Sequence, residues 1–363
     1  MPNSPTYTQL TLTRAVYGFV AVGIFLVGLS TAFLLFTKSS TMLDGALDTA
    51  VRVRASSAGQ NLAQSLHTDW RNLKSLTQNI PSSDPQRITG MMDGMRGDGS
   101  RISWIGFADV NGKVLDASDG LLVGADVSER PWFRNGLQAP YAGDVHKAVL
   151  LAKILSPDAP SDLRFVDLAM PVIDETGQRL GVVGVHINFA WAEAYLREQA
   201  EALGLMLYLA SADGQIIMAS DDEIPNVDEL QILRSSMSGA DLDGREVWPD
   251  GKTYFSSLVP SILYADLPNF GWRLVGRLDG SLFGGSVAAV KGQWMILIAN
   301  LLVVMALLTA VFVRVFISPI ATLGQSAEDI AEGKDIYPPD LSRTKEMAQL
   351  SASLARMQVL KSR

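Results

Sequence analysis

Apolar residues gather in two long uncharged segments near the ends of the chain. Residues 15–36 form a run of 22 without a charged side chain, and residues 294–313 form a second run of 20. At about 1.5 Å of rise per residue, either run forms a helix long enough to cross a hydrocarbon core of about 30 Å. The pattern therefore predicts two transmembrane helices. The alternatives are a cleaved signal peptide for the first run and a buried soluble helix for the second.

The segment after the first apolar run has the periodicity of a helix. Residues 38–79 contain no proline, and Pro81 follows. We predict one stalk helix over residues 38–80 that ends at this proline. Its apolar face is a natural seam for a homodimer, or a surface that packs on the chain's own globular domain. This face consists of Leu62, Leu66, Leu73, Leu76 and Ile80.

Two segments beyond the stalk repeat each other. Residues 108–119 read ADVNGKVLDASD and residues 210–221 read ASADGQIIMASD, with five identities at an offset of 102. Each holds an Asn-Gly or Asp-Gly pair between β-rich runs, which is a strong signal for a β-hairpin. A repeat of about 100 residues predicts two copies of one domain, because solenoid repeats are only about 20–50 residues long.

The remaining runs predict the same order of elements in both copies. The fold class we predict is α+β, with two tandem antiparallel-sheet modules after a long helix. In the first copy we expect a short helix at 128–138 and strands near 102–109, 112–118, 144–154, 163–173 and 180–189. In the second we expect a helix at 190–203 and strands near 205–211, 214–219, 245–248, 253–259 and 271–278.

Composition and charge narrow the classes of function. The chain has 363 residues, of which 48% are hydrophobic and 19% charged, and its net charge is −8. This acidic balance argues against a nucleic-acid partner, because phosphates require a basic patch. The absence of cysteine excludes disulfides, zinc–thiolate sites and thiol nucleophiles. Since the sequence also lacks a Gly-x-Ser-x-Gly elbow, a P-loop and a His-Glu-x-x-His motif, we predict no enzyme activity and no cofactor.

One stretch between the two repeats resembles a known family. Residues 116–138, DASDGLLVGADVSERPWFRNGLQ, are similar to the Gly-x-Asp-x-x-x-Arg-x-Trp-Phe/Tyr pattern of double-Cache sensor domains in bacterial transmembrane receptors. The resemblance covers residues 38–290. It implies two PAS-like modules, a membrane-distal one at 81–190 and a membrane-proximal one at 191–280, with the ligand pocket in the distal module.

The segment after the second apolar run resembles a HAMP signal-relay domain over residues 314–363. Ser318-Pro319 follows the run, and Gly333-Lys334-Asp335-Ile336 is similar to the connector between the two HAMP helices. A departure is Lys345-Glu346-Met347-Ala348, where the family favours Asp-Glu-Ile/Leu-Gly. A generic juxtamembrane coiled coil is the alternative. Two seams with 3-4-3 spacing would build a parallel bundle in a dimer: Ile320, Leu323, Ala327 and Ile330, then Met347, Leu350, Leu354 and Met357.

The HAMP resemblance also implies a topology. HAMP domains are cytoplasmic, so both termini, including a tail at residues 1–14, are expected in the cytoplasm. Residues 37–293 are then expected outside the bacterial inner membrane. Charge counting alone does not decide this, because a large domain translocates largely regardless of its charge.

Six residues of the distal module are the candidate ligand-binding set. Arg130 offers a planar fork for a carboxylate, or an ion pair with Glu129 or Asp126. Trp132 and Phe133 would supply apolar walls, and an aromatic face attracts an ammonium group. Asp167 interrupts an apolar strand, so it is either an ammonium partner or a solvent-facing residue. The full set is Arg130, Trp132, Phe133, Tyr141, His146 and Asp167.

This set suits an amino acid, another small amine or a carboxylate. The amino-acid-binding version of the family resembles the chain only in part, since Ala125 and Phe133 stand where that pattern has tyrosines. We expect His186 to satisfy a local hydrogen bond and His67 to belong to the stalk. Because the three histidines lack metal-ligand spacing, no metal site is predicted.

Together these features indicate the sensory part of a homodimeric transmembrane receptor. A small ligand would bind the distal module, and the HAMP domain would relay the signal to a cytoplasmic output of cyclase, kinase or chemotaxis type. We find no motif of such an output in this chain, so another chain or segment is expected to supply it. The first alternative is a membrane-anchored interaction module that binds a periplasmic protein, and the second is an extracytoplasmic enzyme.

Overall fold

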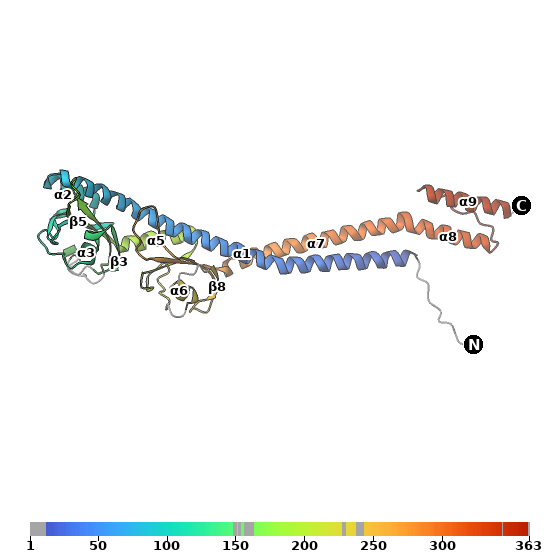
Figure 1. The fold of residues 1–363 in the computed structure, drawn as a ribbon. Helices are drawn as coiled ribbons and strands as arrows, with labels where there is room; N and C mark the ends of the chain where they lie inside the picture. Colours follow the sequence, from blue (N-terminus) through green and yellow to red (C-terminus); the bar gives the residue numbers. More distant parts are fainter. Residues whose placement is uncertain are drawn as a thin grey trace. The chain divides into compact units, whose positions relative to one another are not determined.

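The computed structural model describes residues 12–147, 151, 154–155, 163–226, 230–236, 243–342 and 344–361. The chain divides into two compact units (Figure 1). After the expectations above, we call Leu43–Leu282 the outer unit, and Met1–Met42 together with Phe283–Arg363 the membrane unit. We describe each unit by itself.

The stalk is part of one uninterrupted helix, α1 (Leu12–Asn79), of 68 residues. In the outer unit its leucine face is buried, from Leu62 through Leu76 and on to Ile80 in the short 3-10 helix η1 (Ile80–Ser82). Gly59 of α1 lies against Val259 of the second module, and the Thr77 hydroxyl contacts the Met170 sulfur of the first at 3.4 Å. The predicted stalk helix is confirmed, and its apolar face packs on the chain's own modules.

The two modules are antiparallel sheets of five strands with the same strand order, β2-β1-β5-β4-β3 and β7-β6-β10-β9-β8. The predicted α+β class with two tandem sheet modules is therefore confirmed. The first sheet contains β1 (Ile102–Asp109), β2 (Val114–Ala117), β3 (Tyr141–His146), β4 (Phe165–Ile173) and β5 (Arg179–Asn188). The second contains β6 (Met206–Ala210), β7 (Ile216–Ala219), β8 (Asp243–Val247), β9 (Thr253–Val259) and β10 (Arg273–Asp279).

The repeated hairpins occupy matching places in the two sheets. They connect β1 to β2 and β6 to β7, and their turn glycines, Gly112 and Gly214, have φ of +88° and +87°. This left-handed backbone strains any residue with a Cβ, whereas glycine adopts it freely. The Asn-Gly and Asp-Gly pairs recur at an offset of 102 because both turns need the same backbone conformation.

Strand pairing extends the correspondence to the central strand of each sheet. Trp104 of β1 pairs with His186 of β5, and Met206, the position 102 residues after Trp104, pairs with Arg277 of β10. On the other side, His186 pairs with Asp167 of β4 and Arg277 pairs with Ser256 of β9. His186 and Arg277 therefore hold equivalent positions in the two modules.

Helices cover the sheets and join the modules. Helix α3 (Pro131–Gln138) packs on β4 and β5, where Gly136 lies so close to Ala169 that a Cβ would meet its methyl group at 2.6 Å. The predicted helix 190–203 is present as α5 (Phe189–Leu203) between the modules. Further helical segments are η2 (Ser118–Gly120), α6 (Gln231–Ser236) and η4 (Gly280–Phe283).

Two parts of the distal module differ from the sequence-based expectation. Helix α2 (Pro85–Arg96) was not predicted, because Gly90 and Gly94 weaken its helical pattern. The sequence does contain an N-cap signal, Asp84. Its side chain accepts a hydrogen bond from the Arg87 amide at 2.9 Å.

The strand predicted over 144–154 is also wrong in its bounds. Strand β3 is Tyr141–His146, while Leu151 and residues 154–155 are helical and residues 148–150 and 152–153 lie outside the described residues. A short apolar run fits a strand and a buried helical turn equally well, and here Leu151 is buried in the distal core.

The membrane unit holds two helical stretches that are long and apolar enough to span a bilayer, Val16–Phe33 and Gly292–Ala331. Their large apolar side chains are mostly exposed, with Phe19 at 82% and Ile296 at 71%. The second stretch begins within α7 (Gly284–Phe312) and continues through the single π-turn η5 (Val313–Ile317) and α8 (Ser318–Ala331). Exposed apolar side chains at this density suit contact with lipid rather than water.

The last helix, α9 (Lys345–Lys361), packs against α8. Some residues of the two predicted seams are buried between α8 and α9, and others are exposed. Leu323, Ile330 and Leu354 form a buried cluster, whereas Leu350 and Met357 remain 47% and 52% exposed.

Candidate functional site

A small cavity of about 80 Å³ lies between the distal sheet, the start of α3 and the segment that precedes this helix. At about 10–15 Å³ of such space per water, it has room for roughly five to eight waters, or a ligand of a few heavy atoms. Its apolar walls include Trp104, Trp132 and Leu151. Its polar lining is Asp126, Arg130, His146, Lys147 and His186.

The six candidate ligand-binding residues divide into three groups. Arg130, Trp132 and His146 line the cavity. Phe133 is 4% exposed and Tyr141 is half-buried, and both pack in the distal hydrophobic core. Asp167 is 4% exposed, so it is not the solvent-facing residue of the alternative reading; it lies behind the cavity and contacts two of the histidines.

Arg130 is available to a ligand. It stands at the N-cap of α3 with its side chain exposed. Of the two acidic partners considered from the sequence, Glu129 pairs with Arg134 at 3.4 Å, and none of the residues that the structure describes forms an ion pair with Arg130. A guanidinium at a cavity wall without a carboxylate partner is suited to bind an anion.

Asp126 is the carboxylate of the cavity wall. Its Oδ1 accepts a hydrogen bond from the Ser128 amide at 2.8 Å. The amide and hydroxyl of Ser128 both stabilise the charged form, and they hold the pKa of Asp126 below its usual value. Asp126 is therefore a negative charge at neutral pH, and it is the one carboxylate among the described lining residues.

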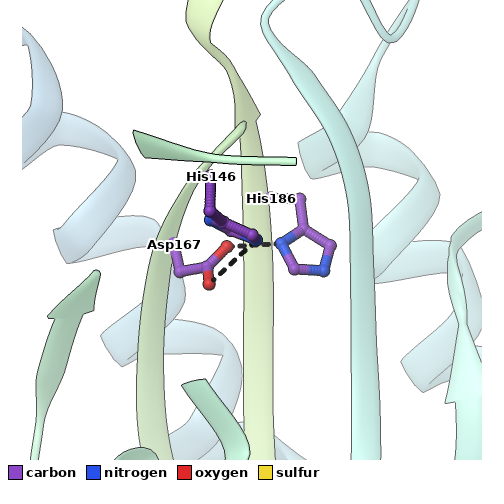
Figure 2. A group of neighbouring side chains, drawn as sticks. All are labelled: His146, Asp167 and His186. Atoms are coloured by element: carbon purple, nitrogen blue, oxygen red, sulfur yellow. Dashed lines mark hydrogen bonds and ion pairs between the residues drawn. The ribbon is translucent and has the colours of Figure 1, made fainter. Parts of the chain in front are cut away.

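Behind the cavity, three adjacent strands bring His146, Asp167 and His186 together (Figure 2). The His186 Nδ1 lies 2.5 Å from Asp167 Oδ1, and the His146 Nε2 lies 3.5 Å from Asp167 Oδ2. The side chains of Asp167 and His186 are 5% and 7% exposed, whereas that of His146 is 37% exposed. His186 therefore does make a hydrogen bond, but its partner is the buried Asp167 of β4 and not a residue near it in the sequence.

Aromatic rings fix the orientation of the His186 imidazole. The Trp104 ring stacks on it with centroids 5.0 Å apart and planes inclined by 29°, and the Trp132 ring meets it edge-on at 6.0 Å. The contribution of His186 to the cavity was not predicted from the sequence. The available signal was a polar residue inside the apolar strand GVVGVHINF, but its partner depends on the pairing of β4 with β5.

The equivalent region of the proximal module is filled by its own side chain. Arg277 is 5% exposed and pairs with Asp221 at 2.8 Å. Its guanidinium lies over three aromatic rings, with 4.2 Å to the centroid of Tyr254, 4.3 Å to Trp248 and 5.1 Å to Tyr208. An arginine held in this way satisfies the aromatic box without any external cation.

Known proteins resemble the chain in sequence and in fold, although no protein-family model matches it. It is 25% identical over 239 residues to the methyl-accepting chemotaxis protein McpA of Pseudomonas putida, which covers 62% of this chain and 33% of that protein. The chain thus spans about a third of the length of this curated relative.

Among solved structures, the ligand-binding domain of the Pseudomonas fluorescens chemoreceptor CtaA, in complex with L-isoleucine, superposes with a TM-score of 0.50 and 16% identity over 69% of this chain and 99% of that one. The chain has the fold of a Cache-type chemoreceptor ligand-binding domain. The ligand-binding domain of Campylobacter jejuni Tlp3, in complex with L-valine, gives a TM-score of 0.47 and 11% identity over 68% of this chain and 97% of that one.

Proposed function

We propose that the chain is the sensory part of a transmembrane receptor, and that its distal cavity binds a small molecule with a carboxylate. The observation that carries this proposal is Arg130, an exposed guanidinium without an ion-pair partner among the described residues, at the wall of a cavity with aromatic sides. The chemoreceptor fold and the sequence relationship to a chemotaxis protein support it.

Amino acids are the ligand class we favour. The CtaA ligand-binding domain, which has a similar fold, is in complex with the amino acid L-isoleucine. In this cavity Arg130 would hold the carboxylate and Asp126 would hold the ammonium group, while Trp132 supplies an apolar wall. Asp167, the ammonium partner expected from the sequence, is less suited to that role because His146 and His186 already contact its two oxygens.

Signal transfer would begin at strand β3, whose end carries His146. Asp144 on the same strand accepts hydrogen bonds from the Ala212 amide at 3.0 Å and from the Trp272 indole at 2.7 Å, both in the proximal module. A ligand that shifts β3 therefore acts directly on the proximal module. It can bias the receptor only by the difference between its affinities for the two signalling states.

The rest of the receptor follows the sequence-based interpretation. The proposal includes two membrane spans, an outer sensor in the periplasm of an inner-membrane protein, cytoplasmic termini and a homodimer. Helices α8 and α9 would form a HAMP-type relay toward a separate output. The exposed Leu350 and Met357 of α9 support this part, because a second copy of the helices would cover them.

A thermal-shift screen of the full chain in detergent tests the ligand proposal. Amino acids, amines without a carboxylate and carboxylates without an amine form the three arms of the screen. We expect a rise in melting temperature with amino acids that Arg130→Ala abolishes. Arg134→Ala is the matched control, because Arg134 is the next exposed arginine and pairs with Glu129. Absence of any shift in all three arms, or a shift that survives in Arg130→Ala, would overturn the proposal.

A further inference from the structure

The cluster of His146, Asp167 and His186 has the composition of a metal site. Each residue offers one ligand atom, and these atoms all lie within 4.8 Å of one another. Within the described residues, no other group of three histidine or acidic side chains meets this criterion. Two imidazoles and one carboxylate are typical ligands of zinc and similar divalent transition metals, whereas calcium and magnesium prefer oxygen ligands alone.

The hydrogen bonding of His146 is the observation that points to a cation between the side chains. Its Nδ1 lies 3.3 Å from the backbone carbonyl of Asp144. A carbonyl only accepts, so Nδ1 carries the proton, and the Nε2 of a neutral imidazole then presents a lone pair. This Nε2 lies 3.5 Å from Asp167 Oδ2, another acceptor. The repulsion between these two atoms is removed either by a second ring proton on Nε2, which makes the contact an ion pair, or by a metal ion that lies between them.

The same carbonyl contact is a usual feature around metal-bound histidines. A metal-ligating histidine generally donates its other ring N–H to a carbonyl or carboxylate, which fixes the tautomer and the direction of the ring. His146 has this arrangement through Asp144, and Trp104 fixes the ring of His186 by stacking on it. The ligand side chains are therefore held in place by groups behind them.

One spacing in the cluster, between His146 and Asp167, is close to that of a tetrahedral site. With zinc–nitrogen and zinc–oxygen distances near 2.0 Å, neighbouring ligand atoms are about 3.3 Å apart. The 3.5 Å between His146 Nε2 and Asp167 Oδ2 matches this value. The 2.5 Å between His186 Nδ1 and Asp167 Oδ1 is a hydrogen-bond distance, so a proton lies between these two atoms. A metal ion would replace this proton, and the distance between the two atoms would increase by about 1 Å.

We propose that His146, Asp167 and His186 bind a divalent transition metal ion of the zinc class at the base of the distal cavity. Three protein ligands leave a fourth position open. Because His146 and His186 both line the cavity, this position faces the space assigned to the small molecule. The inference deepens the proposed function, since the metal would hold one carboxylate oxygen of the ligand while Arg130 holds the other.

The test is a metal titration of the full chain, purified in detergent and freed of metal with a chelator. Zinc is added in competition with a chromophoric chelator, and cobalt is added in parallel because its visible spectrum reports tetrahedral coordination. We expect one equivalent of tightly bound metal. Loss of one ligand in His146→Gln or Asp167→Asn is expected to weaken zinc binding at least about 100-fold, since loss of an outer partner alone costs about 10–100-fold.

The chain supplies a matched control. It has three histidines, and the third, His67, lies on α1, where its Nε2 contacts Asp266 at 2.8 Å. His67→Gln is expected to leave the high-affinity zinc binding unchanged. His146 is the decisive ligand to replace because its half-exposed side chain contributes less to the core than His186, and far-UV circular dichroism verifies that each variant is folded.

The outcomes separate the metal site from the proposed receptor function. Zinc that does not bind, or binds equally well to wild type and His146→Gln, overturns the metal site. If the metal-free chain still shows an amino-acid shift that requires Arg130, the proposed function stands without the metal. If zinc binds as expected but no small molecule changes the melting temperature with or without zinc, the metal site stands and the ligand proposal falls.

Discussion

The two modules share a topology and a strand register, yet one leaves a cavity and the other fills the equivalent region. At the equivalent position of the central strand, the distal module has His186 and the proximal module has Arg277. The neighbouring strand adds Asp167 in the first and Ser256 in the second. The imidazole ends at its carboxylate partner beside the sheet, whereas the longer arginine extends into an aromatic box and pairs with Asp221.

This difference indicates how one copy of a duplicated fold can be suited to ligand binding while the other copy has a structural role. A buried guanidinium with an acidic partner and three aromatic faces is satisfied within the chain, so the proximal module is suited to stability. In the distal module the cationic groups of the cavity lining, Arg130 and Lys147, are exposed instead. The predictions below test the contrast between these two arrangements.

The largest effect is expected from removing the arginine of the proximal module. Arg277→Ala leaves Asp221 without its ionic partner and empties the aromatic box, and loss of one partner of a buried pair costs about 3–5 kcal/mol. Arg130→Ala removes an exposed side chain and should change the free energy of unfolding by less than about 0.5 kcal/mol. Denaturant unfolding followed by tryptophan fluorescence measures both. Equal losses in the two variants would contradict the contrast.

Zinc should stabilise the distal module alone. A ligand that binds only the folded state adds about 2.7 kcal/mol when its concentration is 100 times its dissociation constant. We expect this gain in wild type and in Arg277→Lys, which retains a positive charge in the proximal box, and its loss in His146→Gln. The measurement is the free energy of unfolding with and without zinc. A gain that persists in His146→Gln would place the metal elsewhere.

A single substitution should fill the cavity of the distal module with an arginine side chain, as Arg277 fills the equivalent region of the proximal module. His186→Arg introduces a longer side chain at the base of a cavity of only about 80 Å³, so it should fill space needed by the ligand. We expect at least a tenfold loss of amino-acid affinity, equivalent to about 1.4 kcal/mol. Calorimetric titration measures the affinity, and circular dichroism verifies the fold. Unchanged binding would show that the ligand does not use this part of the cavity.

The smallest effect concerns alkaline pH. Burial and a hydrogen bond to Asp250 raise the pKa of Tyr254 to about 12, whereas an unfolded tyrosine ionises near pH 10. Between about pH 10 and pH 12 the unfolded chain therefore loses a proton that the folded chain retains, and the free energy of unfolding falls as pH rises. Tyr254→Phe should make this decline shallower in an alkaline unfolding series. Burial and Asp221 shift the pKa of Tyr208 in the same direction, so some decline remains.

The sequence determined those features that depend on local pattern. Uncharged runs fixed the two candidate spans, the leucine spacing fixed the long helix, and the turn pairs around Gly112 and Gly214 revealed the duplicated module. These predictions succeed because membrane thickness, helix geometry and turn conformation each impose a requirement on neighbouring residues. Arg130 and Trp132 of the pocket pattern line the cavity, and their role in ligand binding stays a prediction.

Only the tertiary structure decided which side chains meet. Trp132 and Phe133 are neighbours in the pattern and pack in the same core, yet only Trp132 also lines the cavity, because adjacent residues of α3 point in different directions. His186 was expected to make a local hydrogen bond, yet it joins Asp167 and His146 from two other strands. Their meeting depends on the register of β3, β4 and β5, which is set by packing between residues far apart in sequence, and no local pattern records it.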